Sequence, residues 1–169
     1  MFEERINILK KQKDWAWSYN KLKGSMAECI VEQMLRDAGH QVYRFGYEMV
    51  LQHLKEVKLK DNYVKQLISS MPDFIIVNEN GYPDFIEVKY RKDGKLNKDK
   101  RKIEILGEGW GKSRILVVSN KEPYFQISRV ENFLKTGKLY PLEKDIFIKV
   151  NKEIIKRYSD IVKKYFEGK

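Results

Sequence analysis

Two candidate strands on either side of a turn constrain the fold of this chain more than any other feature. Phe74–Val77 reads Phe-Ile-Ile-Val without interruption, as a strand buried on both faces does. Asp84–Tyr90 is a second candidate strand, and the segment between the two, Asn78-Glu-Asn-Gly81, has the composition of a tight turn. The pattern predicts a β-hairpin near the middle of the sequence.

The rest of the chain alternates between helical and strand patterns. Apolar residues at helical spacing indicate a helix over 24–39, and a strand is expected from Gln41 to about Tyr47. Residues 49–70 are lysine-rich and resemble one or two inserted helices, and two further strands are expected at 115–118 and 124–127. We therefore predict an α/β fold, with a central mixed sheet of about 4–5 strands flanked by helices. A helical insertion at 47–71 and a C-terminal amphipathic helix at 150–169 complete it.

The length of 169 residues fits one domain, 1–169, with a core at 24–149. Residues 1–23 form a basic and aromatic arm or helix that contains Trp15, Trp17 and Tyr19. Two interpretations are open for this segment. It can dock onto the body, which we favour, or it can contact nucleic acid, because aromatic and basic residues together suit base stacking and phosphate binding.

Charge and composition narrow the function further. Lys and Arg number 34 against 24 Asp and Glu, so the net charge is +10 and a polyanion, above all nucleic acid, is the expected partner. No apolar run approaches the roughly 18 residues of a membrane span, and Met1–Lys13 lacks the apolar region of a secretory signal. We expect a cytoplasmic protein without membrane contact. The single cysteine, Cys29, excludes a disulfide framework and a multi-cysteine zinc site.

The hairpin also carries the residues best suited to chemistry. Pro72 fits the start of a strand, which places Asp73 at the edge of the sheet. Glu87 and Lys89 are two apart on one strand, so both project from the same face. Two carboxylates can hold Mg²⁺, and a neighbouring lysine can position the attacking water. The alternative is an ion pair that faces solvent, but a Pro-Asp upstream of Glu-x-Lys across a turn favours the functional interpretation.

Asp73, Glu87 and Lys89 resemble the motif of the PD-(D/E)XK nucleases, also called restriction-endonuclease-like. The resemblance implies Mg²⁺ or Mn²⁺ held by Asp73, Glu87 and the backbone carbonyl of Val88, with Lys89 beside the attacking water. The family often adds a glutamate from the helix before the sheet. Here Glu28 and Glu32 are the candidates, and we choose Glu28 because it lies closer to the apolar stripe. A solvated helix glutamate is the alternative interpretation of Glu28.

Within that superfamily the chain is most similar to archaeal Holliday junction resolvases. The similarity covers 23–91 and rests on Lys23-Gly-Ser25 with Ala27-Glu28, on Val42-Tyr-Arg44, and on Glu87-Val-Lys-Tyr-Arg91. Those resolvases pass from the first strand to the Pro-Asp by a short loop. The long basic insertion at 47–71 and the C-terminal helix depart from that pattern.

The sequence thus predicts a metal-dependent endonuclease that hydrolyses phosphodiester bonds in DNA. Branched or junction DNA in recombination, restriction or mobile-element processing fits, and RNA is a further substrate that the sequence does not exclude. The alternative is a catalytically inactive nucleic-acid-binding protein on the same fold. The basic insertion, over Tyr47–Ser70, is expected to contact phosphates. The other expected phosphate contacts are Arg44, Arg91, Lys92, Lys95, Lys98, Lys100, Arg101 and Lys102.

A homodimer is also expected, because cutting two strands generally requires two sites related by a two-fold axis. The apolar stripe between Val150 and Phe166 is a candidate interface. Packing of that stripe within the monomer is the alternative.

Overall fold

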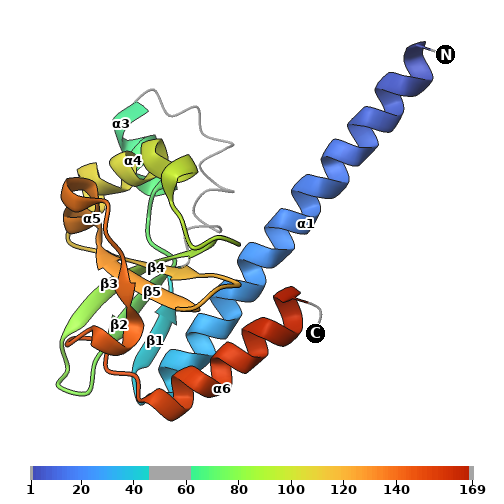
Figure 1. Ribbon diagram of the computed structural model, residues 1–169. Helices are drawn as coiled ribbons and strands as arrows, with labels where there is room; N and C mark the ends of the chain where they lie inside the picture. Colours follow the sequence, from blue (N-terminus) through green and yellow to red (C-terminus); the bar gives the residue numbers. More distant parts are fainter. Residues whose placement is uncertain (1, 46–61, 168–169) are drawn as a thin grey trace.

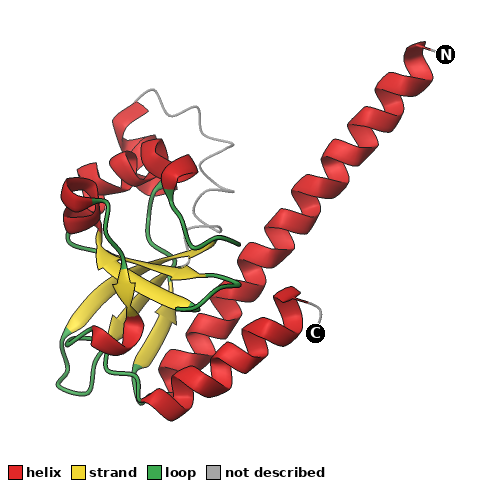
Figure 2. Ribbon diagram, viewed as in Figure 1, coloured by secondary structure: helices red, strands yellow, loops and turns green. Residues whose placement is uncertain are grey.

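The computed structural model describes the backbone of residues 2–45 and 62–167, and the side chains of 14–45 and 63–166. Among these residues the centre is a mixed sheet of six strands in the order β1-β2-β3-β4-β5-β6, in which the β3–β4 pair is parallel and the other pairs are antiparallel (Figures 1 and 2). The α/β class and the mixed sheet are confirmed, and the strand count is six, above the predicted 4–5. The strands are β1 Gln41–Arg44, β2 Phe74–Val77, β3 Pro83–Tyr90, β4 Arg114–Val118, β5 Phe125–Arg129 and β6 Tyr140–Pro141.

The described α-helices are α1 Phe2–Asp37, α3 Asn62–Ser69, α4 Lys100–Trp110, α5 Val130–Thr136 and α6 Lys152–Val162. The single-turn elements are η1 Asn97–Asp99, η2 Leu142–Lys144 and η3 Lys163–Glu167. No helix among residues 2–45 and 62–167 is both long and apolar enough to cross a bilayer. The predicted hairpin is confirmed, with β2 antiparallel to β3 and Phe74 opposite Ile86.

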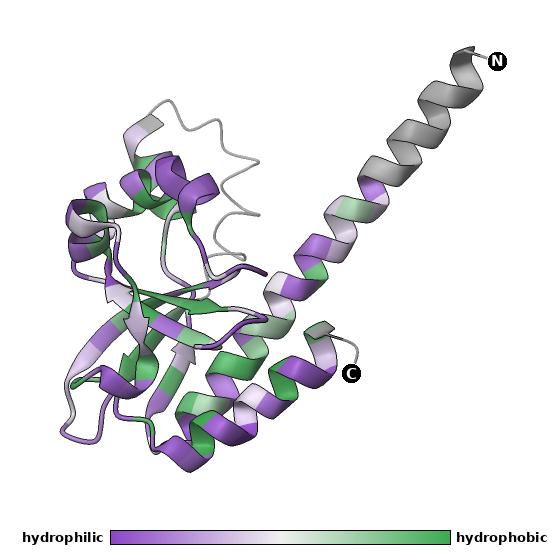
Figure 3. Cartoon of the chain, viewed as in Figure 1, coloured by the Kyte–Doolittle hydropathy of each residue, from purple (hydrophilic) through white to green (hydrophobic). Residues whose placement is uncertain are grey.

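Helices cover both faces of the sheet, because successive strand residues point to opposite sides. Ile86 and Val88 belong to the core beneath α1 and α6, whereas Ile115 and Val117 belong to a second core beneath α4 and α5. β4 lies between the two layers, and all five of its residues are buried. This position explains why its residues 115–118 form a continuous apolar run rather than an alternating pattern. Figure 3 shows the apolar residues gathered where the helices meet the sheet.

α1 differs from the prediction at its beginning. It is one continuous helix from Phe2, not a helix that starts at residue 24, and its first half extends away from the body (Figure 1). Trp15, Trp17 and Tyr19 are 74%, 65% and 50% exposed, so the favoured interpretation, that this segment docks onto the body, is wrong. The polar sequence around the aromatics contains no proline to stop the helix. The predicted end is confirmed, because Gly39 has a φ of 90°.

α6 uses its apolar stripe within the monomer. Ile154, Tyr158 and Val162 are buried in the core that α1 also covers. The Tyr158 hydroxyl donates a 2.7 Å hydrogen bond to the Asp37 carboxylate at the end of α1. The stripe therefore packs within the monomer, which was the alternative interpretation, and is not available as a dimer interface.

Only the end of the predicted insertion at 47–71 can be compared, because residues 46–61 lie outside the described ones. The described part contains α3, which agrees with a helical insertion. Phe45, Phe85 and Trp110 form an aromatic cluster, with ring centroids 5.3 to 5.9 Å apart. The Trp110 indole N–H donates to the Leu67 carbonyl at 3.4 Å, which joins α4 to α3.

The buried guanidinium of Arg114 should be a main determinant of stability. It forms ion pairs with Asp84 and Asp145, and the three side chains are at most 12% exposed. Arg114→Leu leaves two buried carboxylates without their cation, so we expect the free energy of unfolding to fall by about 3–5 kcal/mol in urea denaturation. The control Lys149→Leu removes an exposed pair with Glu79 and should change it by less than about 1 kcal/mol. Equal effects of the two substitutions would contradict this account.

Candidate active-site cleft

An open cleft of about 1210 Å³ lies beside β3, between α1 on one side and α3 and α4 on the other. We call it the β3 cleft. Asp73, Glu87, Lys89 and Glu28, the four residues predicted to be catalytic, all line it. The backbone neighbour Val88 lines it too. Residues from three separate parts of the sequence therefore meet at one surface.

Strand alternation places the polar pair in the cleft. In the parallel β3–β4 register, Glu87 lies beside Ile115 and Lys89 beside Val117, so both project from the face that α4 covers. Asp73 directly precedes β2, at the end of the hairpin that faces the middle of β3. Its Oδ2 accepts a 2.7 Å hydrogen bond from the Val88 backbone N–H. This bond fixes the Asp73 carboxyl next to Glu87.

The charges of the cluster are strongly coupled. Lys89 Nζ contacts Glu87 Oε1, and the two side chains are 20% and 13% exposed. Burial, then the charge of Glu87, raises the pKa of Asp73 to about 8, against the opposing effects of Lys89 and of the Val88 N–H. Burial alone would lower the pKa of Lys89, but the charges of Glu87 and Asp73 outweigh it and raise that pKa. At neutral pH the lysine is charged, and Asp73 holds a proton for much of the time.

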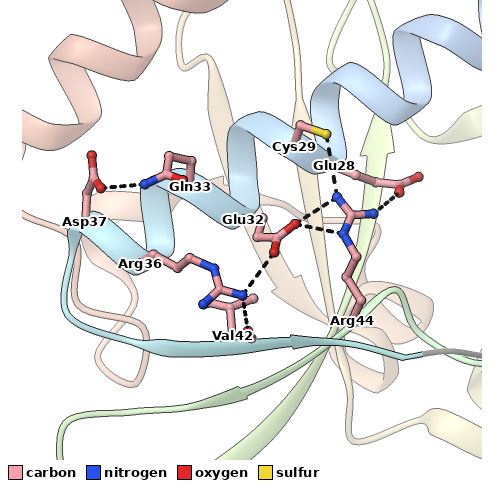
Figure 4. A network of polar contacts seen from close by, with 8 residues as sticks. All are labelled: Glu28, Cys29, Glu32, Gln33, Arg36, Asp37, Val42 and Arg44. Carbon is pink, nitrogen blue, oxygen red and sulfur yellow. Dashed lines mark hydrogen bonds and ion pairs between the residues drawn. The ribbon is translucent and has the colours of Figure 1, made fainter.

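Glu28 and Glu32 occupy different environments, although both belong to a polar network between α1 and β1 (Figure 4). Arg44 lies 2.8 Å from Glu32 and 3.5 Å from Glu28, and Arg36 lies 3.0 Å from Glu32. Glu32 is thus held by two guanidinium groups. Glu28 lines the cleft, and its charge contributes to the raised pKa of Asp73.

The donor set suits a hard divalent cation in part. Within the described residues, no group of three or more His, Cys, Asp or Glu side chains lies close enough together to hold a metal ion. Asp73 and Glu87 are nevertheless adjacent, and the charge of Glu87 adds to burial in raising the pKa of Asp73. A divalent cation relieves such repulsion between carboxylates, and the Val88 carbonyl adds a further oxygen of the kind that Mg²⁺ binds. The residues therefore fit Mg²⁺ or Mn²⁺ as a two-carboxylate site.

The predicted phosphate contacts divide into several groups. Lys92, Lys98 and Lys102 line the β3 cleft, whereas Lys95, Lys100 and Arg101 are exposed but do not line it. Arg91 lines it too, but its guanidinium is bound to the carboxylate of Asp99, a side chain only 3% exposed. The Arg44 guanidinium is paired with Glu32 and Glu28 of α1.

Lys23 and Lys65 also line the β3 cleft. Lys65 belongs to the insertion that was expected to contact phosphates, whereas Lys23 was not expected as a contact. Lys23 begins the segment of α1 that resembles the resolvases, so its position was a usable signal. Lys65 reaches the cleft only because α3 packs against α4, and no local pattern predicts that.

No protein-family model matches the chain, and a comparison with curated proteins finds no match. The chemistry of the β3 cleft itself is therefore what supports a function.

Removal of the Asp73 charge should stabilise the fold. Because the folded-state pKa of about 8 exceeds the ordinary 3.8, the unfolded chain loses its proton first, and wild-type stability falls as pH rises from about 4 to 8. The Asp73→Asn side chain cannot ionise, so the stability of this variant does not fall with pH in this way. We expect its unfolding free energy at pH 8 to exceed that of wild type by about 1–3 kcal/mol, and the gain to vanish near pH 4.

The matched control is Glu104→Gln, which neutralises an exposed carboxylate of α4. It should change the free energy of unfolding by less than about 0.5 kcal/mol at either pH. An Asp73→Asn variant that is less stable than wild type at pH 8 would contradict the electrostatic account of the cluster.

Proposed function

We propose that the protein is a metal-dependent endonuclease of the restriction-endonuclease-like class, which hydrolyses phosphodiester bonds in DNA. The observation that carries the proposal is the meeting of Asp73, Glu87 and Lys89 in one cleft whose rim is lysine-rich. A structural ion-pair cluster has no need of an open cleft of this size. The mixed sheet, with β1–β3 antiparallel and β4 parallel to β3, also supports the resemblance to that class.

Each residue of the cluster has a chemical role under this proposal. Asp73, Glu87 and the Val88 carbonyl would hold Mg²⁺ or Mn²⁺, which when bound polarises the phosphodiester and lowers the pKa of bound water. The Lys89 ammonium would stay charged. It would leave the Glu87 carboxylate and instead contact the attacking water or a phosphate oxygen. The Val88 N–H holds the Asp73 carboxyl in place throughout. Glu28 completes the wall of the cleft from α1 and orients water.

Charge on the rim favours a polyanion. Besides Arg91 and Lys89, five further lysines among the described residues line the cleft, namely Lys23, Lys65, Lys92, Lys98 and Lys102. They come from α1, α3 and the segment from β3 to α4, so they surround the carboxylates rather than follow one helix. Phosphates on both sides of the scissile bond can therefore be neutralised at once. The residues that resemble archaeal Holliday junction resolvases make branched DNA the first substrate to test and RNA the comparison.

A second candidate function is an inactive nucleic-acid-binding protein on the same fold. The contact between Lys89 and Glu87 favours it, because an ammonium on the carboxylate can replace a metal ion. The two candidates differ in their response to metal. An endonuclease should show a rise in melting temperature with Mg²⁺ or Mn²⁺, whereas an inactive binder should show none.

Lys89→Ala tests the catalytic proposal directly. It removes the cation beside the attacking water, so we expect cleavage of single-stranded, duplex, flap, fork and four-way-junction DNA in Mg²⁺ to fall by about 10²–10⁴-fold. Binding measured by anisotropy in EDTA should weaken by less than about threefold, since several other cations line the cleft.

The control Lys156→Ala removes an exposed lysine of α6, on the opposite face of the sheet, and should cleave like wild type. Undiminished cleavage by Lys89→Ala would refute the assignment. If wild type cuts none of these DNAs, nor RNA, and does not respond to metal, the inactive binder is the correct function.

We further propose a homodimer, because a junction or a duplex presents two strands to cut. The α6 stripe is packed within the monomer, so the contact requires another surface. Tyr82, Tyr140 and Ile146 are 64%, 50% and 89% exposed and line a second hollow of about 650 Å³. Light scattering of the wild type should give twice the 20.2 kDa mass of the chain. The Ile146→Asp variant should give the mass of a monomer. A wild-type monomer at low micromolar concentration would refute the dimer.

A further inference from the structure

The projecting half of α1 carries large aromatic side chains that are at least half exposed. Trp15 and Trp17 are 74% and 65% exposed, and Tyr19 is 50% exposed. Figure 1 shows this part of the helix extending beyond the sheet and beyond α6. Aromatic surface of this extent, carried on a rigid helix, is typical of a binding surface rather than of a solvated arm.

One side of α1 lines the β3 cleft and extends beyond it along the projecting half of the helix. Asn20, Gly24 and Glu28 line the cleft and are four residues apart, so they share one side of α1. Trp17 lies three residues before Asn20, at the spacing of the next turn on that side. Trp15 lies two residues before Trp17 and therefore points about 160° away from it. Trp17, and not Trp15, extends the lining of the cleft.

The charges around the aromatic side chains favour a polyanion as the occupant. Lys21 Nζ lies 5.3 Å from the Trp17 ring centre. Lys23 Nζ lies 4.2 Å from the Tyr19 ring and 5.7 Å from the ring of Tyr90, which lines the cleft. The Trp17 ring is thus paired with an ammonium group, and a second ammonium, that of Lys23, lies where the helix enters the cleft. A base that stacks on the ring brings its phosphate to the cation, as in single-strand binding proteins.

We propose that Trp17 stacks on an unpaired base of a nucleic-acid strand whose phosphates continue into the β3 cleft. The proposal rests on the function proposed above and specifies its substrate. Eleven residues separate Trp17 from Glu28, which is about 16 Å along a helix. The unpaired stretch must therefore be at least a few nucleotides long. A base within a blunt duplex is already stacked, so the substrate class is a flap, an overhang or a fork.

The experiment measures binding in EDTA, so that it does not depend on cleavage. Labelled oligothymidine and a blunt duplex of equal length are titrated with wild type, Trp17→Ala, Trp17→Phe and Trp15→Ala. Stacking on tryptophan contributes about 1–3 kcal/mol per base, so Trp17→Ala should raise the Kd for the single strand by at least about fivefold. Trp17→Phe should recover most of this loss. Trp15→Ala, and every variant on the blunt duplex, should stay within about twofold of wild type.

Three outcomes would overturn the inference: no loss with Trp17→Ala, an equal loss with Trp15→Ala, or an equal loss on the blunt duplex. A halved mass of Trp15→Ala or Trp17→Ala in light scattering without nucleic acid would also overturn it. That result would assign the face to a second copy, since Trp15, Tyr19 and Leu22 have the spacing of a helix–helix seam. A failure of Lys89→Ala to reduce cleavage would refute the role assigned to Lys89 and leave the inference about Trp17 standing, because stacking is measured without metal.

Discussion

The fixed alternation of side chains along β3 is the constraint on which the rest of the structure depends. Ile86 and Val88 must face the core beneath α1 and α6, so Glu87 and Lys89 must face the other side. A shift of the strand by one residue would bury both charges beneath α1 and expose the apolar pair. The hydrophobic core thus determines where the polar chemistry lies. The bond from the Val88 N–H to Asp73 uses the same register to add the third polar group.

The polar cluster lowers the free energy of unfolding, because it places ionisable groups close together where water screens them poorly. Two carboxylates and a lysine share a partly buried surface, and the pKa of Asp73 is raised to about 8, first by burial and then by Glu87. A protein selected for stability alone would not keep a carboxyl group with so strongly raised a pKa at the edge of an open cleft, whereas functional sites frequently do. α1 connects this site to the rest of the molecule, because it packs on the core at one end, lines the cleft with Glu28 and exposes Trp17 beyond it.

Local patterns in the sequence were sufficient to predict the hairpin, the α/β class and the convergence of Asp73, Glu87 and Lys89. Each of these depends on strand period or on a turn, which a few neighbouring residues determine. Features that depend on tertiary contacts could not be predicted. β6 has only two residues and exists because β5 offers an edge, and Lys65 lines the cleft because α3 packs on α4. The exposure of Trp17 was missed because composition does not reveal whether an aromatic helix finds a partner.

Crystals soaked in Mn²⁺ and measured for anomalous scattering test the central claim most directly, because the position of the metal is observed without any substrate. The account predicts one strong peak within about 2.2 Å of carboxylate oxygens of both Asp73 and Glu87, with Lys89 released from Glu87. The Asp73→Asn protein should show a weakened or absent peak. No peak between these residues in wild type, with Lys89 still on Glu87, would contradict a metal-dependent site in the β3 cleft.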